Sequence, residues 1–84
     1  MTLERRFVYV MVSETDPDRH YVGLTSDVAR RLETHNSGGS QYTSRHRPWR
    51  LLVSLDFARQ DSAVAFEKYL KTGSGRAFAK RHFV

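Results

Sequence analysis

The chain has 84 residues, a net charge of +5 and no cysteine. A chain of this length can bury one modest core, and the lack of cysteine excludes disulfides and thiolate metal sites. The apolar run at residues 7–12 is too short for a signal sequence or a membrane span. We therefore expect one domain over residues 1–84, located in the cytoplasm and without a membrane contact.

The positive charge is unevenly distributed along the chain. Residues 1–40 carry five Lys and Arg against six Asp and Glu, whereas residues 41–84 carry nine against three. Four aromatic residues stand among the basic ones: Tyr42, Trp49, Phe78 and Phe83. Basic and aromatic residues together favour a polyanion partner, most simply nucleic acid. A solubilising surface explains the charge equally well.

The first part of the chain predicts a hairpin followed by a helix. Residues 6–12 form a β-rich apolar run typical of a strand buried on both faces, and residues 20–25 form a second short strand after a polar loop. Residues 26–39 predict a helix with Ser26 as N-cap, and the segment from Asn36 to Gly39 ends it.

The second part predicts one strand and two helices. Residues 49–57 alternate in hydrophobicity, with Leu51, Val53, Leu55 and Phe57 on one buried face. Residues 60–73 predict a helix capped near Asp61 and ended by Gly73, and residues 74–84 a last short helix or turn. The resulting order, ββαβαα, indicates a small α+β domain.

Arg31 and His35 in the first helix share a face with its apolar residues. Val28, Arg31, Leu32 and His35 follow the i, i+3, i+4, i+7 spacing, so the apolar pair brings the other two toward the sheet. A buried arginine needs a carboxylate or a phosphate as partner. An arginine at the edge of the stripe, with its guanidinium in water, is an equally acceptable interpretation.

Glu67 and two tyrosines complete the candidate site. Glu67 leans toward the apolar face of its helix, where it can pair with Lys71 or bind a divalent cation. Tyr9 and Tyr21 become diagonal neighbours if the hairpin pairs residues of equal parity, although two tyrosines in a sheet are more often core residues. Hydroxyls, an arginine, a histidine and a carboxylate on one surface suit phosphodiester hydrolysis. The four histidines lack zinc-site spacing, and we expect His46 to be a solvated loop residue.

The sequence resembles the GIY-YIG nuclease domain over about residues 6–73. The resemblance rests on "VYV" (8–10), "YVG" (21–23), Arg31, "HNSGG" (35–39) and Glu67. It extends to "YTSRHRPWRLL" and "FEKYLKTGSGRAF", which are similar to the small stand-alone branch of the family. The resemblance implies a three-stranded antiparallel sheet flanked by helices.

The resemblance also implies a role for each matching residue. Tyr9 would activate the attacking water, Tyr21 would support the nucleophile and phosphate, and Arg31 would bind the phosphate. His35 would assist proton handling, Gly23 would allow close passage of the backbone, and Asn36 would be a structural cap. Glu67 would hold Mg²⁺ or Mn²⁺.

The sequence departs from the family pattern at two places. The first motif, Val8 to Val10, lacks its leading glycine, and Leu24 stands where the DNA-repair branch often has lysine, so we do not expect repair-type incision. Without a recognisable DNA-targeting segment, specificity would come from the basic half, an oligomer or a protein partner.

Three functions follow from these observations. The first is a metal-dependent endonuclease, for which we expect DNA rather than RNA as the substrate, in branched, single-stranded or damaged form or targeted by a protein partner. The second is a non-catalytic nucleic-acid-binding module with the same fold, and the third is a protein-interaction domain supported only by Trp49 and the aromatic tail. The side chains expected to bind nucleic acid are Arg45, Arg47, Arg50, Lys71 and Arg76.

Overall fold

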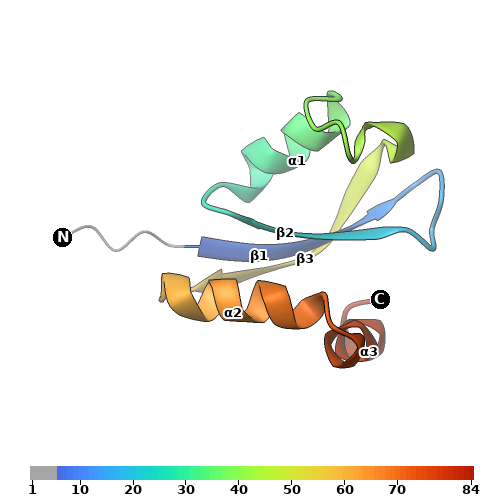
Figure 1. The fold of residues 1–84 in the computed structure, drawn as a ribbon. Coiled ribbons are helices and arrows are strands. Elements are labelled where there is room, and N and C mark those ends of the chain that lie inside the picture. Colours follow the sequence, from blue (N-terminus) through green and yellow to red (C-terminus); the bar gives the residue numbers. More distant parts are fainter. Residues whose placement is uncertain (1–5) are drawn as a thin grey trace.

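A three-stranded antiparallel sheet lies between one helix and a pair of helices. The computed structural model describes residues 6–84, so the first five residues of the predicted domain lie outside the described part. The strand order is β2-β1-β3, with α1 on one face and α2 and α3 on the other (Figure 1). In chain order the elements are β1 (Arg6–Ser13), β2 (His20–Thr25), α1 (Val28–Asn36), the 3-10 turn η1 (Ser44–His46), β3 (Trp49–Phe57), α2 (Gln60–Leu70) and α3 (Gly73–His82). The predicted α+β class and the order ββαβαα are confirmed.

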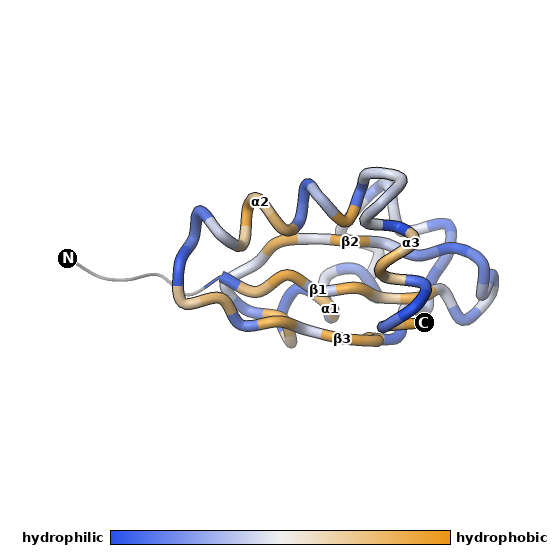
Figure 2. The backbone as a smooth tube through the Cα atoms, turned by 90° about the horizontal axis from the view of Figure 1, so that it is seen from below, coloured by the Kyte–Doolittle hydropathy of each residue, from blue (hydrophilic) through white to orange (hydrophobic). Residues whose placement is uncertain are grey.

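The central strand β1 is buried on both faces, as its continuous apolar run predicts. Val8 and Val10 point toward α2 and pack with Ala63 and Leu70. The intervening residues Tyr9 and Met11 point the other way and pack with Trp49, beneath α1. Figure 2 shows hydrophobic colour along β1 and β3 and hydrophilic colour in the loops at the end of the sheet. One strand therefore supplies two cores of different character.

The predicted single buried face of β3 is interrupted by a β-bulge. Val10 pairs with Val53 but the next residue, Met11, pairs with Leu51, so Leu52 is the extra residue. Because a bulge shifts the side-chain alternation by one residue, Leu51 packs with the cluster under α1 while Val53 packs on the opposite face. The prediction that Leu51 and Val53 share a face is therefore wrong.

The ends of the first two helices also differ from the predictions. Asp27, not Ser26, is the N-cap of α1, because its carboxylate accepts from the Arg30 amide at 3.1 Å. Arg59 occupies the N-cap position of α2, and Asp61 lies in the first turn, where it pairs with the Arg59 guanidinium. Gly73 is the first residue of α3 rather than the end of α2.

Most of the aromatic residues that stand among the basic ones are internal. Trp49 is buried, and Phe78 and Phe83 pack against the cluster beneath α2. Only Tyr42 of the four is largely exposed, at 76%. This removes the support for a protein-interaction domain, which rested on Trp49 and the aromatic tail. In the part of the chain described, no helix has the length and apolar character needed to cross a membrane.

Candidate active site

Tyr9 is the centre of the candidate site and is held beneath α1 by the sheet. It pairs with Gly23 across the hairpin, and its ring lies over that glycine, where any Cβ would overlap it. Tyr21 pairs with the next-but-one residue, Met11, which makes the two tyrosines diagonal neighbours with ring centroids 6.2 Å apart. The predicted relation between the tyrosines is confirmed. Gly23 makes room for a side chain rather than for passing backbone.

The first helix presents its four spaced residues to this side of the sheet. Val28 and Leu32 pack against the cluster that contains Tyr9, and His35 is fully buried. Arg31 is half-buried, and the nearby Tyr9 hydroxyl, together with Tyr21, raises the pKa of its guanidinium. The helix therefore places Arg31 beside the two tyrosines, with part of its side chain still exposed.

A chain of hydrogen bonds leads from Tyr9 into the protein. The Tyr9 hydroxyl lies 2.8 Å from His35 Nε2, and His35 Nδ1 lies 2.7 Å from the Thr43 hydroxyl. Thr43 donates its own proton to the Ser40 carbonyl at 3.4 Å. The tautomer of His35 that donates Nδ1–H to Thr43 has Nε2 free to accept the Tyr9 proton. With this tautomer, proton donation runs from Tyr9 to His35.

Burial and charge keep both partners neutral near pH 7. Burial raises the pKa of Tyr9, and the nearby Tyr21 and Glu67 add to the increase, while the hydrogen bond from Arg31 opposes it. Burial, and secondarily the positive charge of Arg31, lowers the pKa of His35. A neutral imidazole beside a neutral phenol is a proton acceptor in contact with a proton donor.

Glu67 approaches the site from the other face of the sheet. Its helix, α2, packs against β1 and β2, and its carboxylate lies near enough to influence the pKa of Tyr9. The side chain is 16% exposed and pairs with Lys71. The predicted ion pair between Glu67 and Lys71 is therefore present in the structure. A divalent cation would compete with Lys71 for the same carboxylate oxygens.

The residues present fit a divalent cation held by one carboxylate. Within residues 6–84 no cluster of three or more His, Cys, Asp or Glu side chains could hold a metal. A small, strongly hydrated ion such as Mg²⁺ commonly binds through one or two carboxylates together with waters and substrate phosphate. Glu67 can supply that carboxylate from α2, on the face of the sheet opposite the Tyr9 side chain.

Two further residues support the site without facing it. The Asn36 side chain donates to the Trp49 carbonyl and accepts from its amide, so it ties α1 to β3 rather than capping a helix. The Trp49 indole donates to the Thr43 carbonyl at 2.9 Å, which fixes the loop that carries the Thr43 hydroxyl. Thr43 escaped the sequence analysis because a threonine in a polar loop carries no distinguishing signal.

The five predicted nucleic-acid-binding residues fall into two groups. Lys71 and Arg76 line a groove that also includes Tyr21. Arg45, Arg47 and Arg50 do not line this groove; they are exposed on η1, the turn after it and the start of β3, and the Arg47 guanidinium lies against Gly38. His46, predicted to be solvated, is half-buried, and its carbonyl accepts from the Ser13 hydroxyl.

Comparison with known proteins gives relatives of two kinds. Structure-specific endonuclease subunit SLX1 of Scheffersomyces stipitis is 46% identical over 67 residues, covering 71% of this chain and 20% of that protein. A UPF0213 protein of Streptococcus pneumoniae is 39% identical over 64 residues, covering 75% of this chain and 65% of the relative. The chain therefore spans a fifth of the first relative and slightly less than two thirds of the second.

A solved structure and a family model agree with these similarities. The solution NMR structure of a UPF0213 protein from Bacillus halodurans matches 94% of this chain and 86% of its own, with a TM-score of 0.57 and 26% identity. The model of the GIY-YIG catalytic domain matches residues 5–81. Since that match includes the strands and helices that carry Tyr9, Arg31 and Glu67, the chain belongs to the GIY-YIG catalytic domain family.

Proposed function

We propose that the chain is a divalent-metal-dependent endonuclease that hydrolyses phosphodiester bonds in DNA. The observation that carries the proposal is the Tyr9 hydroxyl, which lies 2.8 Å from His35 Nε2 and close enough to Arg31 to raise the pKa of its guanidinium. A phenol placed between a phosphate-binding cation and a neutral imidazole can take a proton from water and pass its own proton inward. The family assignment and the similarity to a structure-specific endonuclease subunit support the same reaction.

Each residue has a distinct part in the proposed reaction. The Tyr9 oxygen takes a proton from the attacking water while His35 Nε2 takes the phenolic proton. The water oxygen bonds to phosphorus, the bond to the leaving oxygen breaks, and solvent protonates the leaving oxygen. Arg31 would stabilise the charge on the non-bridging oxygens, and Tyr21, which also raises the pKa of Arg31, would help to hold the phosphate.

Glu67 would hold the cation that the reaction requires. A bound Mg²⁺ or Mn²⁺ supplies Lewis-acid stabilisation of the phosphate and leaving oxygen. Lys71 pairs with Glu67 in this structure, so binding of the cation would release the ammonium group. Lys71 also lines the groove, where it could pair with a phosphate.

A cleavage assay with matched variants tests the proposal. End-labelled single-stranded, duplex and branched DNA would be incubated with the protein in Mg²⁺, Mn²⁺ or EDTA. We expect metal-dependent cutting that Tyr9→Phe and Glu67→Gln abolish. Arg31→Ala should slow cutting about 10²- to 10³-fold, the loss typical of one preorganised donor to transition-state charge. Arg30→Ala, which removes the exposed neighbouring arginine, should keep nearly full activity.

The alternative, a binding module with the same fold, predicts a different result. It gives salt-sensitive binding to DNA, because phosphate neutralisation releases counterions, with no cutting in any metal. Equal losses for Arg31→Ala and Arg30→Ala would also contradict the proposed role of Arg31. Alanine at Arg45, Arg47 and Arg50 should weaken binding more than turnover if those residues contact nucleic acid.

A further inference from the structure

Tyr42 is an exposed aromatic residue beside the candidate site. The proposed reaction gives this residue no role. It precedes Thr43, the last side chain of the hydrogen-bond chain, and its ring is 76% exposed. The ring centroid lies 6.0 Å from that of Tyr21, with the planes tilted by 49°. The exposed ring beside Tyr21 is therefore available to stack on a flat ligand.

The ring faces a groove of about 1040 Å³ that follows the edge strand β2. Tyr21 and Tyr42 form an aromatic wall on the side of α1. Lys71, Arg76 and Lys80 line the groove from the side of α2 and α3. The groove therefore has an aromatic side and a cationic side, and it includes Tyr21 of the candidate site.

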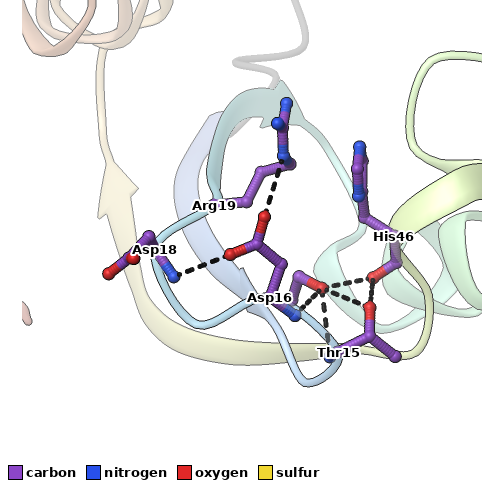
Figure 3. A network of polar contacts seen from close by, with 6 residues as sticks. Thr15, Asp16, Asp18, Arg19 and His46 are labelled. Atoms are coloured by element: carbon purple, nitrogen blue, oxygen red, sulfur yellow. Dashed lines mark hydrogen bonds and ion pairs between the residues drawn. The ribbon is translucent and has the colours of Figure 1, made fainter.

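The β1–β2 loop lines part of the groove and has little positive charge. It contributes Asp16, Asp18 and Arg19 to the lining, and the Arg19 guanidinium pairs with the Asp16 carboxylate at 3.5 Å (Figure 3). The Ser13 hydroxyl fixes the loop by accepting from the Asp16 amide and donating to the His46 carbonyl. A polyanion would therefore place its phosphates along α3 rather than toward this loop.

We infer that Tyr42 stacks on an unpaired base and so directs the groove toward single-stranded nucleic acid next to the scissile phosphate. With the backbone along the cationic wall, a base must reach across to the aromatic wall with one face uncovered. In a duplex both faces of a base are covered by its neighbours, whereas in a single strand they are free to stack on an aromatic side chain. The position next to the scissile bond rests on the proposed function; the stacking itself does not.

Binding measured in EDTA tests the inference separately from cleavage. Fluorescence anisotropy at one fixed ionic strength would give the Kd of a labelled single strand and of the same sequence as a duplex. Tyr42→Ala should weaken binding of the single strand about 5- to 150-fold, the range expected for loss of one stacked base. Duplex binding should change less than twofold, and Tyr42→Phe should restore single-strand binding.

Two controls separate stacking from other effects. A single 2-aminopurine in the strand should be quenched by the wild type and by Tyr42→Phe, but not by Tyr42→Ala. Circular dichroism melts of all three proteins should agree, because the side chain is mostly exposed. Arg59→Ala, on an exposed cation that does not line the groove, should leave single-strand binding unchanged.

The possible results distinguish this inference from the proposed function. Equal losses for single strand and duplex, or a Tyr42→Phe protein as weak as Tyr42→Ala, would overturn the stacking role. Metal-dependent cutting without any effect of Tyr42→Ala overturns this inference alone. Selective loss of single-strand binding in a protein that never cuts supports the stacking role and contradicts the nuclease.

Discussion

The two faces of β1 are built from consecutive residues of one strand but are organised in opposite ways. Toward α2, Val8 and Val10 pack with Ala63 and Leu70 in a cluster made of aliphatic groups. Toward α1, the buried face includes the Tyr9 hydroxyl and the His35 imidazole, and these are hydrogen-bonded to each other and onward to Thr43. The same strand thus separates an apolar core from a polar network.

This difference indicates which face supports stability and which supports chemistry. An aliphatic cluster tolerates small shifts, since dispersion and hydrophobic burial have little directionality. A buried polar network depends on every hydrogen bond, because an unpaired buried group costs about 1–3 kcal/mol. We therefore expect substitutions beneath α1 to affect catalysis first and substitutions beneath α2 to affect stability first.

The largest effect is expected from Gly23→Ala, which disturbs the polar face. The new Cβ would overlap the Tyr9 ring, and the hydroxyl would move away from Arg31 and His35. A displacement of about 1 Å of a catalytic group can cost about 10²-fold in rate. Initial cleavage rates should show that loss, accompanied by a decrease of about 1–3 kcal/mol in unfolding free energy from overpacking.

Gly73→Ala provides the matched control for this substitution. A Cβ at Gly73 meets no atom within 4 Å, so its cleavage rate and unfolding free energy should stay close to those of the wild type. A Gly23→Ala protein with full activity would show that Tyr9 need not keep its position, and would contradict the contrast between the faces.

A smaller effect, of the opposite kind, is expected from Val8→Ala on the apolar face. Val8 is fully buried, and removing its two methyl groups should lower the unfolding free energy by about 2 kcal/mol in urea titrations. The cleavage rate per folded molecule should remain within about twofold, because the Tyr9 side chain points to the other face. Lys68→Ala, exposed on α2, should change neither quantity. A large loss of turnover in folded Val8→Ala protein would show that the two faces are coupled, and would contradict the proposed separation of stability from catalysis.

The polar face should also give a pH dependence that comes from His35. Its folded-state pKa is lowered by burial first and by Arg31 second, so below its usual value of 6.5 the unfolded chain binds the proton more readily. The contribution of His35 to the free energy of unfolding is therefore constant above pH 6.5. It decreases as the pH drops from 6.5 toward the folded-state pKa. The cleavage rate should fall about tenfold per pH unit below that pKa, since protonated His35 cannot accept from Tyr9.

Two measurements check this dependence. NMR titration should place the His35 midpoint below 6.5, and the acid limb of the rate profile should follow it. His46→Gln should keep the acid limb unchanged, because its ring is outside the hydrogen-bond chain from Tyr9. An activity that stays constant well below the NMR midpoint would exclude His35 as the proton acceptor.

Several features were not predictable from local sequence. The bulge at Leu52 lets β3 pair with β1 while its side chains fill the clusters on both faces. The hydrophobic alternation of β3 alone does not predict this bulge. The capping role of Asp27 depends on the turn that begins at Thr25, whose hydroxyl accepts from the Asp27 amide. Neither feature has a distinct sequence pattern, because Ser26 and Asp27 are both good N-cap residues.

The sequence by itself determined the strands, the helices and the side of α1 that carries Arg31 and His35. These properties follow from periodicity, which the residue spacing expresses directly. Only the tertiary structure decided that Thr43 orients His35, that Trp49 is internal, and that Tyr42 stands exposed at the groove. These residues come from one irregular loop and the start of β3, and their roles depend on contacts with distant segments that no local spacing specifies.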